Sequence, residues 1–136
     1  MNKRNDGYLV KKFPLLYRDR HASMSKSAMH WGFSCGDGWF KLVRDLSKKL
    51  ETMIVNGKLK SRAAQVKEKF GTLRFYMTGG VTPEMNEEIH RAEALSARTC
   101  EKCGKPGKLV KIEGWLYTFC SRCKKVGERA EERKIA

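Results

Sequence analysis

Two CxxC pairs near the end of the sequence constrain its fold more than any other feature. Cys100 and Cys103 form the first pair, Cys120 and Cys123 form the second, and residues 104–119 separate them. Two pairs of thiolates at this spacing are typical of a site in which four sulfurs surround Zn²⁺. Because four protein sulfurs leave no coordination position for water, the sequence predicts one zinc ion with a structural role.

The residues between the two pairs predict a β-hairpin. Residues 108–112 alternate imperfectly between polar and apolar side chains, as a strand does. Glu113-Gly114 can form the turn, and the aromatic-rich residues 115–119 can form the returning strand. Two cysteine pairs bridged by a hairpin make a zinc ribbon, and a last helix is expected over about 121–134. Two disulfides or a redox CxxC are the alternatives, but nothing in the sequence signals export and a redox motif needs no second copy.

Upstream of the ribbon, residues 38–55 predict an amphipathic helix. Its apolar side chains recur at steps of four and three residues: Trp39, Val43, Leu46, Leu50 and Met53. This spacing places them on one face of a helix, with charged residues opposite. Asp37 is expected to cap the N-terminus of the helix, and Asn56-Gly57 is expected to end it.

Residues 64–77 predict a second β-hairpin, and residues 83–97 predict a second helix. Gly71-Thr72 is the expected turn of the hairpin. Thr82-Pro83 is the expected start of the helix, with Thr82 as its N-cap. The predicted fold class is therefore α+β, a small helix-plus-β-hairpin domain followed by a C-terminal zinc ribbon.

Three segments follow from these patterns. Residues 1–30 are expected to form a basic N-terminal arm, whose polar and basic start over residues 1–12 is loose or ordered by a partner. Residues 31–98 form the α+β core with both helices and the first hairpin. Residues 99–136 form the zinc ribbon and the C-terminal helix.

Charge indicates the class of partner. The 136 residues include 29 Lys and Arg against 15 Asp and Glu, which gives a formal net charge of +14. Such an excess favours a polyanionic partner, most often nucleic acid, over a basic surface that serves only solubility. The sequence has no apolar run long enough for a membrane helix and no secretion signal, so we expect no membrane partner and a cytoplasmic location.

Three groups of basic residues compete for the polyanion. The ribbon group comprises Lys102, Lys105, Lys108, Lys111, Arg122, Lys124 and Lys125. The N-terminal group comprises Lys11, Lys12, Arg18 and Arg20. The hairpin group comprises Lys67, Lys69 and Arg74, with Tyr76 near them.

The ribbon group is the favoured nucleic-acid site. It has the most charges in the shortest span, and rigid donors lose less entropy on binding than a flexible arm does. Tyr117 is expected to add base stacking there, with Trp115 and Phe119 on the opposite face of the strand. The N-terminal group is expected to make a secondary contribution.

The fifth cysteine, Cys35, is a candidate nucleophile, but the sequence favours a small buried cysteine. No suitable base is placed beside it, and His21 and His30 are the candidates. A nuclease that uses His21, His30 and Asp37 is a weak alternative, because these residues lack metal-ligand spacing. We therefore expect a non-catalytic protein.

Three blocks of this sequence resemble a family of small phage and prophage proteins that has no established activity. The blocks are Cys35-Gly-Asp-Gly-Trp-Phe40, Gln65-Val-Lys-Glu-Lys-Phe-Gly71 with Leu73-Arg-Phe-Tyr76, and the tail CxxCG…GW…TxCxxC. The likeness covers about residues 30–125. It implies a phage context, and hence the cytoplasm of an infected bacterial host.

Together these features predict a non-catalytic phage zinc-ribbon protein. Its expected partner is nucleic acid or a nucleoprotein machine such as RNA polymerase or the ribosome. Zinc ribbons also serve as protein–protein platforms. The alternative is therefore a phage effector that docks on a host protein, such as a defence protein, and inhibits it.

Overall fold

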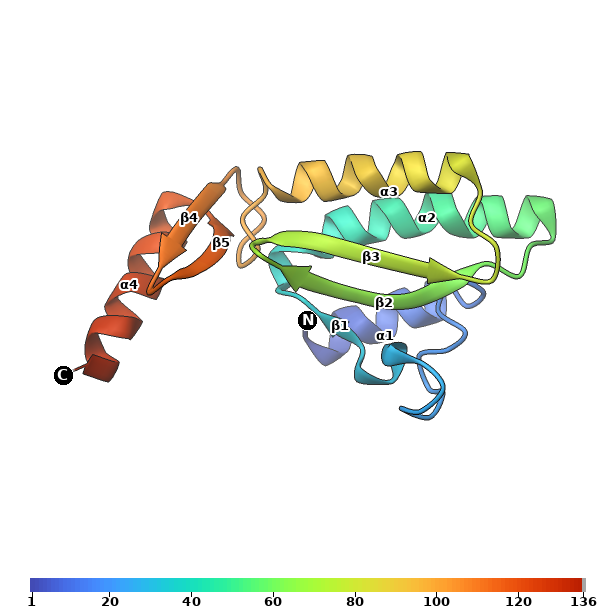
Figure 1. Cartoon of the computed structure of the whole chain (residues 1–136), viewed down its shortest axis with the longest axis horizontal. Helices are drawn as coiled ribbons and strands as arrows, with labels where there is room; N and C mark the ends of the chain where they lie inside the picture. Colours follow the sequence, from blue (N-terminus) through green and yellow to red (C-terminus); the bar gives the residue numbers. More distant parts are fainter. Residues whose placement is uncertain (136) are drawn as a thin grey trace.

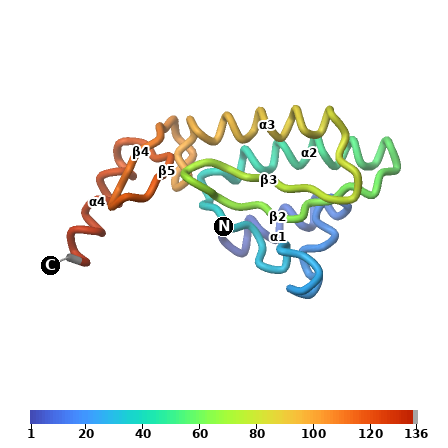
Figure 2. The backbone as a smooth tube through the Cα atoms, in the orientation of Figure 1, coloured from blue at the N-terminus to red at the C-terminus, as the bar shows by residue number. Residues whose placement is uncertain are grey.

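The computed structural model describes residues 1–135 and confirms the predicted α+β class; Ala136, the last residue of the predicted ribbon segment, lies outside these residues. In chain order the elements are α1 (Lys3–Lys12), η1 (Ala28–Trp31), β1 (Phe33–Ser34), η2 (Asp37–Trp39), α2 (Phe40–Gly57), β2 (Arg62–Lys69), β3 (Thr72–Thr78), α3 (Pro83–Ser96), β4 (Lys108–Ile112), β5 (Trp115–Phe119) and α4 (Ser121–Ile135). Figure 1 shows hairpin β2–β3 beside α2 and α3, and places β4, β5 and α4 at one end of the long axis. Figure 2 follows the same path as a tube.

The core of the larger domain lies between a three-stranded sheet and the helices on one of its faces. Strand β2 is antiparallel to β3 and parallel to the short β1, in the order β1-β2-β3. Val66, Leu73 and Phe75 of the hairpin are buried together with Leu46 and Leu50 of α2. Removal of these apolar side chains from water is the main force that holds sheet and helices together.

Helices α2 and α3 confirm the two predicted core helices. Thr82 caps α3 as expected, since its Oγ1 accepts the Met85 backbone N–H at 3.2 Å. The predicted cap of α2 is wrong, because Asp37 begins the η2 turn ahead of that helix. The Asp37 carboxylate instead accepts the Asn2 backbone N–H at 2.8 Å and the Asn5 side-chain amide at 3.0 Å. Asp37 therefore ties the start of α1 to the core.

The predicted N-terminal arm over residues 1–30, with its loose or partner-ordered start at residues 1–12, is wrong. Residues Lys3–Lys12 form α1, and its Leu9 is fully buried. Phe13, Leu16 and Tyr17 follow the helix and lie in the same core cluster as the sheet. The segment is therefore an integral part of the core domain, because it supplies apolar side chains that the sheet and α2 alone do not.

The turn of hairpin β2–β3 lies at Phe70-Gly71, one residue before the predicted turn at Gly71-Thr72. Phe70 and Gly71 have φ values of 53° and 85°, and they connect the paired residues Lys69 and Thr72. Positive φ at both central residues is the mark of a type I′ turn, whose twist matches that of the flanking strands. The Phe70 side chain consequently projects from the end of the hairpin.

The ribbon packs against the core domain at two glycines of the loop before α2. The Gly38 N–H donates to the Glu101 carbonyl at 2.7 Å, and the Gly36 N–H donates to the Glu101 carboxylate at 2.9 Å. A Cβ at Gly38 would overlap the backbone of Cys100 and Glu101, and a Cβ at Gly36 would overlap the Glu101 carbonyl. This close approach of two backbones therefore requires glycine at both positions.

Two buried side chains extend this junction. The indole Nε1 of Trp39 donates to the Thr99 carbonyl at 2.8 Å, and Thr118 Oγ1 donates to the Gly71 carbonyl at 2.6 Å. Trp39 and Thr118 are both fully buried. A buried donor that loses its partner is destabilising, so these bonds fix the orientation of the ribbon on the core.

Gly38→Ala tests the junction, with Gly7→Ala as the matched control. The added methyl group at Gly38 meets backbone atoms that cannot move aside, so we expect the free energy of unfolding to fall by about 1–3 kcal/mol. Gly7 lies inside α1 with no atom within 4 Å of an added Cβ. Alanine there should stabilise by about 0.5–1 kcal/mol. Urea unfolding measures the stability of both variants. Equal stability of Gly38→Ala and the wild type would contradict the close backbone contact at Gly38.

Candidate metal centre

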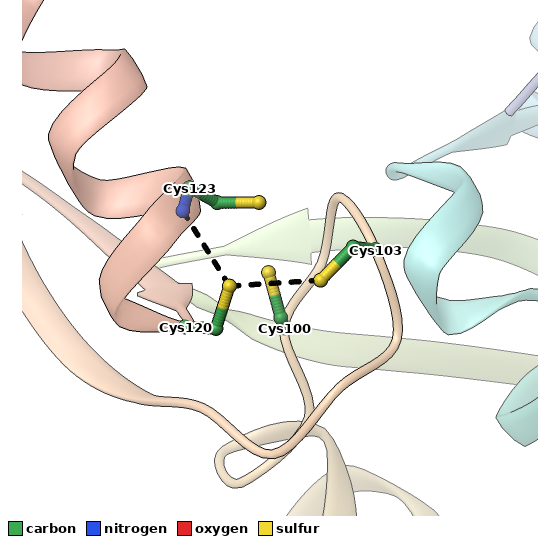
Figure 3. Close-up of side chains that lie close together, drawn as sticks. All are labelled: Cys100, Cys103, Cys120 and Cys123. Atoms are coloured by element: carbon green, nitrogen blue, oxygen red, sulfur yellow. Dashed lines mark hydrogen bonds between the residues drawn. The ribbon is translucent and has the colours of Figure 1, made fainter.

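The four cysteines of the two CxxC pairs come together at the end of the ribbon nearest the core. The sulfur atoms of Cys100, Cys103, Cys120 and Cys123 all lie within 4.8 Å of one another (Figure 3). The Sγ atoms of Cys103 and Cys120 are 3.6 Å apart. Four sulfurs placed about 2.3 Å from a tetrahedral metal lie about 3.8 Å from one another. The arrangement therefore fits a metal ion at its centre.

The local backbone aims these sulfurs inward. The Gly104 N–H donates to the Cys100 carbonyl at 2.9 Å, and Gly104 has a φ of 79°, so the first pair closes into a tight loop. The second pair lies at the start of α4, where the Lys124 N–H donates to the Cys120 carbonyl at 2.9 Å. The Cys123 backbone N–H points at the Cys120 sulfur at 3.4 Å.

Hydrogen bonds and burial affect the four thiols differently. The backbone N–H of Cys123 lowers the pKa of Cys120 to about 6. Burial opposes ionisation of Cys100, but backbone hydrogen bonds outweigh it and lower the pKa of that thiol. Burial raises the pKa of Cys123 to about 12. A metal ion binds all four as thiolates and displaces the protons that remain. The donor set suits a soft-ligand divalent metal ion.

The alternative of two disulfides is not what the described residues form. All five cysteines are free thiols. The 3.6 Å between the Cys103 and Cys120 sulfurs is well beyond the bond length of about 2.05 Å in a disulfide. Within residues 1–135, these four cysteines are also the one cluster of His, Cys, Asp or Glu side chains that could hold a metal ion.

The ribbon group of basic residues lies on the outside of the ribbon. Six members are exposed: Lys102, Lys105, Lys108, Lys111, Arg122 and Lys125. Lys124 is half-buried and pairs with Glu128 at 3.4 Å. The six exposed members form no ion pair within residues 1–135. The ribbon therefore presents positive charge that no carboxylate of the described chain neutralises.

The predicted arrangement of aromatic side chains on β5 is wrong. Tyr117 and Phe119 stack with ring centroids 4.9 Å apart and an angle of 12° between the rings. Side chains two positions apart on a strand share a face, so Trp115 also lies on this side. Tyr117 is half-buried against Phe119, whereas Trp115 is 71% exposed. Trp115 is therefore the better platform for stacking.

Half of the N-terminal group is committed to the fold. Arg20 forms an ion pair with Asp6 at 3.0 Å, and Arg18 donates to two backbone carbonyls. Lys11 and Lys12 are exposed on the last turn of α1. Arg18 is nevertheless exposed and forms no ion pair within residues 1–135, so Lys11, Lys12 and Arg18 keep a charge that is open to a partner, whereas the charge of Arg20 is paired.

The hairpin group lies on the outer face of the core sheet. In the register of the two strands, Lys67 lies opposite Arg74, and Lys69 lies opposite Thr72. These positions alternate with the buried residues of the core face, so their side chains point away from α2 and α3. Tyr76 continues this face and is 43% exposed.

Two of the three residues considered for a nuclease serve other contacts in this structure. His30 Nδ1 lies 2.9 Å from the Ala22 carbonyl, and the Asp37 carboxylate accepts bonds from the start of α1. His21, His30 and Asp37 form no metal-ligating cluster within residues 1–135.

Two exposed rings were not singled out as site residues from the sequence. Phe70 is 67% exposed at the tip of hairpin β2–β3, and Trp115 directly follows the Glu113-Gly114 turn. One signal in the sequence could have found Phe70. Type I′ turns favour Asn-Gly, so a Phe-Gly pair between two strands indicates an aromatic side chain placed there at a conformational cost.

No protein-family model, curated protein or solved structure matches this chain. Among the helices of residues 1–135, none combines the length and the apolar character that a membrane crossing needs.

Cys35 is 7% exposed, and burial raises its pKa to about 12. We therefore expect iodoacetamide to leave Cys35 unmodified in the native protein at about pH 8, because the thiolate is the reactive form. In the unfolded chain the pKa returns to about 8.5 and Cys35 should react. Since the unfolded chain loses this proton first, the thiol's contribution to stability is complete below about pH 8.5 and declines as the pH rises toward 12.

Peptide mass spectrometry after alkylation, with and without denaturant, measures this difference. Rapid modification of Cys35 in the native protein would favour the nucleophile hypothesis over the packed thiol.

Proposed function

We propose that the four-cysteine site holds one Zn²⁺ and that the ion is structural. Four thiolates in two CxxC pairs are a common ligand set for structural zinc. The two pairs come from a loop and from the start of α4, on either side of hairpin β4–β5. Bound zinc would join these segments and so hold the ribbon closed, because the apolar cluster of the ribbon is small and contains Cys100 itself.

Cys120→Ser tests this role. We expect purified wild-type protein to contain about one zinc per chain by elemental analysis, and the variant to contain little. The ribbon should lose its order, whereas the core domain should stay folded because it has a separate apolar cluster. Amide hydrogen exchange measured segment by segment distinguishes the two parts. Wild-type protein free of zinc whose ribbon is nevertheless protected from exchange would exclude a structural zinc.

We further propose that the ribbon is a non-catalytic nucleic-acid-binding module, acting on free nucleic acid or on a nucleoprotein machine. The observation that carries this proposal is the set of six exposed basic residues without an ion pair on the small ribbon. Lysine and arginine side chains that neutralise phosphates release counterions, and this release supplies sequence-independent affinity. The net charge of +14 favours the same class of partner.

The resemblance to small phage and prophage proteins supports a phage context, with the host cytoplasm as the place of action. A phage effector that docks on a host protein remains the competing function. The two differ in their dependence on salt. Binding through phosphate contacts weakens steeply as salt rises, with a slope of about 0.9 per contact on duplex DNA, whereas an apolar docking site is nearly independent of salt.

The triple variant Arg122→Gln, Lys124→Gln, Lys125→Gln tests the ribbon group. We expect nucleic-acid affinity to fall and the salt slope to decrease by about one for each phosphate that the variant no longer neutralises. Lys124 already pairs with Glu128, so Arg122 and Lys125 should account for most of the change. Fluorescence anisotropy with a labelled duplex and a labelled single strand, over a range of salt, measures both quantities.

The double variant Lys11→Gln, Lys12→Gln is the matched control for the N-terminal group. It leaves the buried residues of α1 intact, which a deletion of the segment would not. A larger loss of binding in this control than in the triple variant would locate the main contacts on α1 instead of the ribbon.

A further inference from the structure

An open cleft lies between the tip of hairpin β2–β3 and hairpin β4–β5. Its walls come from the β2–β3 end, with Lys69 and Phe70, and from the β4–β5 end, with Lys111, Gly114 and Trp115. The cleft has a volume of about 670 Å³, within the range of about 300–1,000 Å³ that is usual for ligand sites.

The walls of this cleft are held in fixed positions. Thr118 on the second hairpin donates to the Gly71 carbonyl at the tip of the first, and Thr118 is fully buried. A Cβ at Gly71 would lie 2.7 Å from the Leu109 side chain and 3.2 Å from the Leu116 backbone, so the tip of the first hairpin is in tight contact with the strands of the second. The cleft therefore exists before any ligand binds.

Phe70 lines this cleft in a backbone conformation that is unfavourable for a bulky residue. Its φ of 53° lies in the left-handed region, where a bulky side chain is unfavourable. Its ring is 67% exposed, so burial does not compensate for this conformation. At the equivalent position of the other turn stands Glu113, a residue that water solvates well. Folding alone does not explain an aromatic ring at Phe70, and such departures from local preference concentrate at functional sites.

Trp115 also lines the cleft and is 71% exposed. Lys69 and Lys111 are also exposed and form no ion pair within residues 1–135. The Lys69 ammonium lies 5.5 Å from the centre of the Phe70 ring. The one carboxylate in the cleft belongs to Glu68, and it accepts the Gly71 N–H at 2.8 Å as part of the turn.

The outer face of the core sheet leads away from this cleft. Beyond Lys69 it carries the cross-strand pair Lys67 and Arg74, and then Tyr76 opposite Gln65. Lys69 and Gln65 are four residue steps apart along the strand, which gives this basic face a length of about 13 Å. Aromatic rings and lysines thus occur together in the cleft and along the adjoining sheet.

We propose that the cleft binds single-stranded nucleic acid, with bases stacked on Phe70 and Trp115 and phosphates beside Lys69 and Lys111. This proposal rests on the proposed function and names the form of nucleic acid that the protein takes. Exposed aromatic rings within a basic groove are how proteins bind single strands without sequence preference, because every base has a flat face. Bases in a duplex are already stacked on one another and cannot reach the rings. Lysine is depleted at protein–protein interfaces, so the cleft is less suited to a protein partner.

Phe70→Asn and Trp115→Thr are the test variants, and Trp31→Ala is the matched control. Asparagine is favoured at the first central position of a type I′ turn, so Phe70→Asn should be at least as stable as the wild type. Threonine suits an exposed strand position and keeps β5 intact. Trp31 is 68% exposed but lies in η1, outside the residues that line the cleft.

Binding is measured by fluorescence anisotropy with labelled oligo(dT) and oligo(rU) of about ten nucleotides, and with a duplex of the same length, on the full zinc-loaded chain. We expect each cleft variant to weaken single-strand binding by about 5- to 100-fold and to leave duplex binding nearly unchanged. Trp31→Ala should bind like the wild type. In that background, oligo(dT) should quench the fluorescence of Trp115, since the remaining Trp39 is fully buried.

Three results would overturn the proposal, and they are distinguishable. If the cleft variants bind single strands like the wild type while the ribbon triple variant loses binding, the cleft is not the site but the proposed function stands. If the wild type binds neither single strands nor duplex, the proposed function itself is wrong. If the wild type captures a host protein, and the cleft variants do not capture it although their nucleic-acid binding is unchanged, the cleft is a protein-docking surface.

Discussion

The close contact between the glycine loop before α2 and the Glu101 peptide unit joins the two halves of this molecule. Gly36 and Gly38 donate their N–H groups to Glu101, which lies between the first two metal-site cysteines. Burial of Glu101 raises the pKa of its carboxyl, and the bond from Gly36 opposes this change. A side chain at either glycine would separate the two backbones. The position of the ribbon relative to the sheet thus depends on two missing Cβ atoms.

Local patterns predicted most of the elements, because their causes are local. The helical steps of α2, the Thr82-Pro83 start of α3 and the paired cysteines each act within one short segment. The N-terminal segment could not be assigned in the same way. Leu9, Phe13 and Leu16 have helical spacing, but only Leu9 lies within α1, and the residues around it are mostly polar. The apolar pattern within the helix is therefore too short to recognise. Their burial depends on the sheet and α2, which are distant in sequence, and a pattern within one window cannot show that contact.

The blocks Cys35-Gly-Asp-Gly-Trp-Phe40 and Gln65-Val-Lys-Glu-Lys-Phe-Gly71 have a structural explanation in the fold. The first supplies the glycines that contact Glu101 and the indole of Trp39 that donates to Thr99. The second ends in Gly71, whose carbonyl accepts the bond from Thr118 of the ribbon. Both blocks therefore meet the cysteine tail at one junction. A catalytic interpretation of the Cys35 block is unnecessary, because its residues are accounted for by packing and hydrogen bonds.

Phe70 belongs to the second block but makes none of these junction hydrogen bonds. Close neighbours in the ribbon leave no room for a side chain at Gly71, whereas Phe70 is 67% exposed and lines the cleft together with Trp115. The same contacts that position the ribbon therefore also set the distance between the two rings. If zinc orders the ribbon, it also fixes the second wall of the cleft, although neither ring is a ligand. Loss of the metal would then weaken stacking by removing the preorganisation of the site, while lysines on the core sheet kept their charge. Metal binding and recognition of bases, as proposed here, would then be linked through Thr118 and Glu101.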